Sequence, residues 1–175
     1  TPKRNIDTHL PNILSALSDF GIGDRTMTNM ALATIRAETE GFVPISEGQS
    51  RFNTVNYPFD RYDAGTRIGR NLGNTQSGDG ERIKGRGFIQ NTGRFIYTDV
   101  GNKIGEALVD KPDIANDSKV AAKILCLFLH DRQDRIRYGL SQRDMRSARR
   151  AVNGGTHGLG RFIDAFEVGE RVLPT

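Results

Sequence analysis

Apolar residues recur at helical spacing near the start of the chain and again over its second half. Between residues 8 and 20 they form one stripe, which predicts a first helix capped at residue 7 or 8 and ended by Gly21. A second helix is expected to begin near residues 24–26 and to turn its apolar side chains toward the core. Glu38 lies in the last turn of this second helix.

The second half of the chain predicts further helices. Residues 93–105 suit a short helix, and Asp117 is suited to cap a strongly apolar helix that we expect at the centre of the core. Ser141 with Asp144 resembles a capping box for another helix. A last apolar stripe predicts a helix over residues 159–172.

The segment between residues 41 and 87 lacks this period and is rich in glycine, asparagine and proline. It predicts a long structured loop region with short strands at most, and such loops are uncommon in a compact domain unless they form a binding site. Aromatic residues such as Tyr62 suit either sugar stacking or anchoring of these loops on the core. The pattern predicts one mainly α-helical domain over residues 1–175, with at most a small β-hairpin lining a cleft.

The composition narrows the functional classes. The single cysteine, Cys126, stands in an apolar run, and the three histidines are too scattered to form a metal site, so we expect no disulfide, metal or cofactor. No apolar run approaches the roughly 18 residues of a membrane span, and the first residues do not resemble a signal peptide. A net charge of +4 and a pI near 9.5 favour a polyanionic partner, either an anionic cell wall or nucleic acid.

Glu38 and Glu47 stand on either side of an expected reversal of the chain. Gly41 can take the left-handed conformation that ends helices, and Pro44 cannot extend one. A helix C-terminus disfavours negative charge, which suits Glu38 to donate a proton, and Glu47 in a polar loop suits a general base. An exposed glutamate at an ordinary helix end has the same spacing, so this pattern alone leaves both interpretations open.

A glycine-rich stretch over residues 78–94 permits close backbone approach. A phosphate cradle is one interpretation, but the stretch has neither the P-loop spacing nor the dinucleotide fingerprint. Gln90 and Thr92 present an amide and a hydroxyl on the same side of an extended segment, an arrangement that suits sugar hydroxyls and a held water.

Arginines are concentrated between residues 132 and 150. Because aspartates are interleaved and the arginines do not keep to one helix face, we expect a solvated surface rather than a nucleic-acid-binding helix. This surface can still attract anionic polymers.

Several motifs occur in series along the chain: A-E-T-E-G-F at 37–42, Glu47, F-D-R-Y-D at 59–63, L-G-N-T-Q-S-G-D-G at 72–80, G-R-G-F-I-Q-N-T-G-R at 85–94 and V-N-G-G-T-H-G-L at 152–159. Together they resemble glycoside hydrolase family 19, which includes chitinases and the lysozyme-like endolysins of bacteriophages. The resemblance covers roughly residues 30 to 165.

This resemblance implies a lysozyme-like α-helical fold and inverting hydrolysis of β-1,4 glycosidic bonds. By similarity, Glu38 matches the general acid, Glu47 matches the general base, and Thr92 helps to hold the attacking water. The expected substrate contacts are Gln90, Asn153, Tyr62 and Arg86.

The chain departs from the family pattern at several positions. Ala37 replaces a histidine, Glu40 replaces a glycine, and Ile96 stands where the family has an asparagine. Arg161 lies one place earlier than the arginine expected after the N-G-G segment. The change at Ile96 leaves a different substrate open, and Ile96 together with Ala37 leaves open a non-catalytic glycan-binding module. We expect Glu40 to tune Glu38 or to face solvent.

Bacterial peptidoglycan is favoured over chitin as the substrate. The domain is compact, lacks plant-type disulfide cysteines, and has a short interval between its two glutamates and a positive charge suited to anionic walls. We expect a monomer that acts on the cell wall, in the periplasm or outside the cell, after phage lysis or export by a dedicated secretion system. Nucleic acid is not expected as a partner. Because the sequence starts at Thr1, we also expect that the domain was excised from a larger protein.

Overall fold

A computed structural model describes residues 1–174, with every side chain among them except that of Asn153. The α-helices are α1 (Lys3–Asp19), α2 (Arg25–Glu38), α3 (Arg67–Asn71), α4 (Asp79–Arg82), α5 (Arg94–Ile104), α6 (Ser118–Asp131), α7 (Gln133–Ser141), α8 (Met145–Asn153) and α9 (Leu159–Val172). Two 3-10 helices, η1 (Asp60–Tyr62) and η2 (Pro112–Asn116), and two strands, β1 (Ile45–Ser46) and β2 (Arg86–Gly87), complete the described elements. The fold is therefore mainly α, as the apolar pattern predicts.

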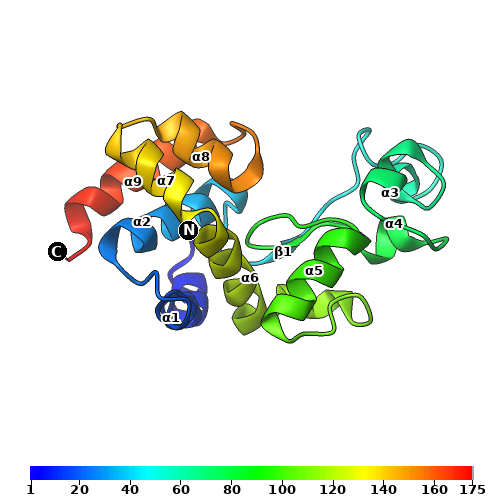
Figure 1. Cartoon of the computed structure of the whole chain (residues 1–175), viewed down its shortest axis with the longest axis horizontal. Helices are drawn as coiled ribbons and strands as arrows, with labels where there is room; N and C mark the ends of the chain where they lie inside the picture. The colour runs from blue at the N-terminus through cyan, green and yellow to red at the C-terminus, as the bar shows by residue number, and fades with distance from the viewer. Residues whose placement is uncertain (175) are drawn as a thin grey trace.

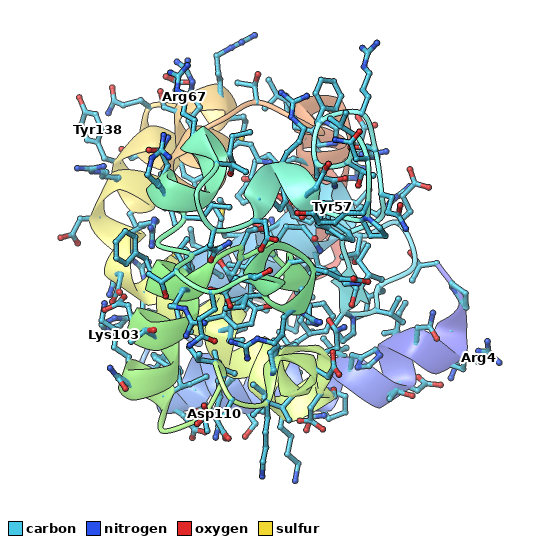
Figure 2. All side chains as sticks on the ribbon, turned by 90° about the vertical axis from the view of Figure 1, so that its right-hand side faces the viewer. Arg4, Tyr57, Arg67, Lys103, Asp110 and Tyr138 are labelled. Atoms are coloured by element: carbon cyan, nitrogen blue, oxygen red, sulfur yellow. The ribbon has the colours of Figure 1, made fainter. Side chains whose placement is uncertain are left out.

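The helices form two lobes on either side of α6 (Figure 1). One lobe holds α1, α2 and α7 to α9, in which α2 packs on α9 and α7 packs on α8. The other holds α3, α4 and α5 together with the long loops, and Figure 2 turns this lobe toward the viewer, with Tyr57 and Arg67 labelled. The short β1–β2 pair lies between the lobes.

Helix α6 forms the centre of the core, as its sequence predicts. Asp117 caps it by accepting hydrogen bonds from the backbone N–H groups of Lys119 and Val120. The helix contacts α1, α2, α5 and α7. Cys126 is fully buried in it, and burial raises the pKa of this thiol to about 12, so the side chain acts as a small neutral hydrophobe.

The second helix begins as predicted, with the Asp24 carboxylate accepting a hydrogen bond from the Met27 N–H. The prediction for the start of α1 is wrong, because that helix begins at Lys3 with Pro2 as its N-cap. Residues 7 and 8 lie inside it, where Asp7 pairs with Lys3 at 2.7 Å. Pro2 has an extended backbone, with φ of −63° and ψ of 131°, and makes no side-chain capping bond, so the predicted cap is absent from this helix start.

Helix α7 lies in the arginine-rich segment that the sequence pattern assigned to a solvated surface. Only Ile136 and Gly139 of its residues are buried, so no apolar stripe reveals it. A β-carbon at Gly139 would lie 2.9 Å from the backbone nitrogen of Ala148, which shows how closely α7 approaches α8.

The chain turns at residues 40–43, between α2 and β1, but Gly41 does not take the left-handed conformation that the sequence allowed it. Phe42 takes it instead, with φ of 57°. Its ring is buried against Phe88, with ring centroids 6.3 Å apart. Burial of this ring stabilises a backbone conformation that a non-glycine residue rarely adopts.

The two strands pair antiparallel, with Ile45 opposite Gly87 and Ser46 opposite Arg86. They come from segments far apart in the sequence, so the small sheet is not the local hairpin that the pattern allowed. The pairing continues one residue further, because the Glu47 N–H donates to the Gly85 carbonyl at 2.7 Å. Over residues 1–174, no helix combines the length and apolar character needed to cross a membrane.

Candidate active site

Glu38 is the last residue of α2 and borders a cavity at the junction of the lobes. The cavity has a volume of about 600 Å³, within the range of about 300–1,000 Å³ typical of ligand sites. Its wall is built from α2, α5, α6, α7, α8 and the loop after β2. The lining residues are Glu38, Ile89, Gln90, Asn91, Ile96, Phe128, Arg132, Arg135, Arg150, Ala151, Val152, Gly154 and His157.

Arg149 holds the Glu38 side chain at the edge of this cavity. Its guanidinium forms an ion pair with Glu38 Oε1 and also donates to the His157 carbonyl at 3.1 Å. The Arg149 side chain is fully buried, whereas that of Glu38 is 11 % exposed. A buried guanidinium with two fixed acceptors is rigid, so it fixes the direction of the Glu38 carboxyl group.

Glu47 lies just beyond β1, where two side chains donate to a single one of its oxygens. Oε1 accepts from the Tyr62 hydroxyl at 2.8 Å and from Asn53 Nδ2 at 2.9 Å. Oε2 accepts a longer bond, 3.3 Å, from the Gly85 N–H. Burial, followed by the hydrogen bond to Glu47, raises the pKa of Tyr62, so its hydroxyl stays protonated and keeps donating.

Gln90 and Thr92 meet Glu47 around Gly85. A β-carbon added there would have three oxygen neighbours: Gln90 Oε1 at 2.7 Å, Thr92 Oγ1 at 3.0 Å and Glu47 Oε2 at 3.1 Å. Glycine at this position therefore leaves a small space that three polar side chains share. Since Gln90 also lines the cavity beside Glu38, the two glutamates border the same stretch of loop.

The other predicted substrate contacts do not all lie at the site. Tyr62 joins the site as a hydrogen-bond donor to Glu47. Arg86 is only 5 % exposed and lies outside the cavity lining, where it bonds the Arg82 carbonyl at 3.0 Å and pairs with Asp113 at 2.9 Å. These bonds fix the loop before β2, so we leave Arg86 out of the proposed substrate contacts. The side chain of Asn153 lies outside the described part of the chain.

Two departures from the family pattern can be placed around the end of α2. Ala37 is buried, and a β-carbon at Gly158 would lie 2.9 Å from the Ala37 carbonyl oxygen, so the loop before α9 packs directly on this turn. Glu40 is 76 % exposed and pairs with Arg161 at 2.6 Å. Of the two roles expected for Glu40, this placement matches facing solvent. Ile96, where the family has asparagine, gives the cavity an apolar patch.

Two residues of the site were missed by the sequence analysis. Arg149 was grouped with the exposed arginines, although it shares a helix face with Met145 and Val152, four residues before and three after it, and that spacing is a usable signal. Asn53 is 1 % exposed and bonds Glu47, a contact across loops that no local pattern indicates.

Within the described residues, no group of histidine, cysteine, aspartate and glutamate side chains is arranged to hold a metal ion. Comparison of the chain with protein-family models and with curated protein sequences gives no match.

Proposed function

We propose that this chain is a peptidoglycan-degrading glycoside hydrolase of the lysozyme type, which cleaves β-1,4 glycosidic bonds by an inverting acid/base mechanism. One observation carries the proposal: Gln90 lines the cavity that Glu38 borders and also converges with Thr92 on Glu47. Two carboxyl groups on one cleft are what glycoside hydrolysis requires. The order of the motifs along the chain supports the same assignment.

In this mechanism Glu38 is the general acid that protonates the glycosidic oxygen. It borders a cavity large enough for sugar units, and Arg149 keeps its carboxyl group in one orientation. Proton transfer to a leaving group needs the donor within hydrogen-bond reach of the reacting atom, so a fixed carboxyl orientation contributes to the rate.

Glu47 is the general base. Tyr62 and Asn53 both bind its Oε1, and Oε2 faces the space shared with Thr92 and Gln90. A water held there by the Thr92 hydroxyl and the Gln90 amide can pass its proton to Oε2 as it attacks the sugar. In inverting enzymes the two carboxyl groups stand about 6.5–9.5 Å apart to leave room for this water.

The site acts, in this proposal, as part of a monomeric lysozyme-like domain on the bacterial cell wall. The first test is digestion of purified sacculi, with product masses and with the anomeric form of the new reducing end followed by NMR. Inversion gives the α-anomer first, whereas a β-anomer at first would assign a retaining mechanism and exclude Glu47 as a base of this kind. Cleavage of chitin oligomers but not of sacculi would assign chitin as the substrate.

The second test is substitution of the two glutamates. Glu38→Gln and Glu47→Gln should each lower the rate of reducing-end release by about 10²–10⁴-fold. Glu40→Gln is the matched control and should leave the rate unchanged, because that side chain is 76 % exposed. Binding of glycan by the wild type without any cleavage would replace the enzyme by a glycan-binding module.

A further inference from the structure

Three arginines line the cavity beside Glu38: Arg132, which stands between α6 and α7, Arg135 of α7 and Arg150 of α8. They form what we call the arginine wall. Figure 1 shows α6 between the lobes, with α7 and α8 in the lobe that also holds α2 and α9. Their guanidinium groups therefore bring positive charge to one side of a cavity whose other side carries Gln90 and Asn91.

None of the three forms an ion pair with a carboxylate of the described residues. By contrast, Arg137 of the same segment pairs with Asp24 at 2.6 Å and Arg149 pairs with Glu38. Asp131 and Asp134 line a neighbouring hollow together with Arg132 and Arg135, but they are not among the residues that line the cavity beside Glu38. The carboxylate in the lining of that cavity is Glu38, which pairs with Arg149, so the three arginines leave a net positive charge there.

The wall is also partly rigid. The Arg132 guanidinium stacks over the Phe128 ring at 4.5 Å, and Phe128 itself lines the cavity. Stacking fixes the plane of a guanidinium but leaves its edge N–H groups available, and these match the two oxygens of a carboxylate. Arg135 and Arg150 are exposed and reach the same cavity from neighbouring helices.

From this arrangement we infer that the arginine wall is a subsite for a carboxylate carried by the glycan substrate. This inference rests on the proposed function and deepens it. A chitin chain is neutral and offers the wall nothing to bind, whereas peptidoglycan carries carboxylates on the lactyl ether of alternate sugars or on the peptides attached there. The three arginines therefore select a carboxylated glycan over an uncharged one.

The test compares glycan strands that differ only in this charge. Peptide-free peptidoglycan strands, the same strands with their lactyl carboxyl groups converted to methylamides, and strands with intact stem peptides are digested under equal conditions. The wild type should cleave the carboxylated strands with kcat/KM about tenfold or more above that of the amidated strands, as expected for charge-assisted hydrogen bonds. A preference only for strands with peptides assigns the peptide carboxylates as the ligand.

Arg135→Gln, Arg150→Gln and the double variant should lose this preference, because their kcat/KM for carboxylated strands falls to the level of their kcat/KM for amidated strands. Arg146→Gln, an exposed arginine of α8 outside the cavity lining, makes the same change of charge and should keep the preference. Equal cleavage of charged and amidated strands by the wild type, or a preference that survives the double substitution, would overturn the subsite and leave the hydrolase assignment intact.

If neither strand is cleaved, the hydrolase assignment fails, and binding of the same two strands decides the subsite. Calorimetry should then show tighter binding of the carboxylated strand, lost in the double variant but kept in Arg146→Gln. Equal or absent binding refutes the subsite. Tight binding of a short DNA duplex that the double variant loses, without discrimination between the strands, would assign the wall to nucleic acid instead.

Discussion

The fully buried guanidinium of Arg149 forms an ion pair with Glu38 Oε1, which lies 111 residues earlier in the chain. This pair joins α8 to the end of α2 at the border of the cavity. Because Arg149 also donates to the His157 carbonyl at 3.1 Å, one side chain fixes both Glu38 and the loop before α9. The side chain of Glu38, the proposed acid, is therefore held by a buried arginine that is itself fixed by a second contact.

Arg149→Gln should be strongly destabilising. Removing one member of a buried ion pair leaves the other charge without compensation, which typically costs about 3–5 kcal/mol. Urea denaturation measures the free energy of unfolding, and the loss should be smaller when Arg149→Gln is made in a Glu38→Gln background. Arg161→Gln is the control, since its pair with Glu40 is exposed and is worth about 0–1 kcal/mol. A stability equal to that of the wild type would contradict the support role.

Tyr62→Phe should slow catalysis with little effect on stability. The change removes one of the two side-chain donors to Glu47 Oε1, at 2.8 Å, and leaves the ring in place. We expect kcat to fall about tenfold to a hundredfold with KM nearly unchanged, since only the orientation of the base is altered. Tyr57→Phe is the matched change, because that tyrosine is 56 % exposed and its longer bond goes to Asp63 at 3.3 Å. Equal kcat values for Tyr62→Phe and Tyr57→Phe would show that the Tyr62 hydroxyl does not contribute to catalysis.

Gly85→Ala should strongly lower the activity while the protein stays folded. The new methyl group would meet Gln90, Thr92 and Glu47 oxygens at 2.7 to 3.1 Å and displace at least one of them. Reducing-end release should fall by about a hundredfold or more, because a shift of about 1 Å in a catalytic group costs that much. Gly48→Ala, next to Glu47, meets no atom within 4 Å and should keep full activity. If Gly85→Ala kept full activity, the space between Gln90, Thr92 and Glu47 would have no role in the mechanism.

The sequence predicted those parts of the fold that depend on local pattern. The cap at Asp117 and the apolar run after it fix α6 without reference to the rest of the chain. The sequence predicts a turn after α2 and points to Gly41, because glycine adopts the left-handed conformation most easily. The burial of the Phe42 ring, which places that conformation at Phe42 instead, depends on the packed fold and has no local signal. Helix α7 was missed because its contact with α8 depends on glycine rather than on an apolar stripe.

The site was predictable only in part for the same reason. Glu38, Glu47, Gln90 and Thr92 were found through motifs in series, but nothing in the chain assigned Arg149 to the buried side of α8 and Arg146 and Arg150 to the exposed side except their spacing. Asn53 reaches Glu47 from a different loop, and such contacts follow from the packed loops as a whole. Arg86, expected as a substrate contact, donates to the Arg82 and Lys84 carbonyls, and no local pattern indicates these bonds.

Asp79→Asn should destabilise the lobe that holds α3, α4 and α5 in a pH-dependent manner. Asp79 is fully buried and accepts from Arg94 Nη2 at 2.6 Å and from the N–H groups of Thr75 and Gln76, each at 3.0 Å. Burial alone would raise the pKa of this carboxyl group, but the Arg94 bonds and the two amides outweigh it and hold its pKa below 3.8.

The unfolded chain therefore binds the proton first, so the contribution of Asp79 is complete above pH 3.8 and is lost as the pH falls through the lower folded value. Urea denaturation at neutral pH should show Asp79→Asn to be less stable by about 3 kcal/mol, the cost of breaking a buried pair. The difference from the wild type should shrink as the pH is taken well below the ordinary aspartate value. Asp99→Asn removes a carboxylate that is 62 % exposed and pairs with the half-exposed Lys103, so it should change stability little at any pH. A difference for Asp79→Asn that stays constant on acidification would show that its ionised form is not what holds the lobe together.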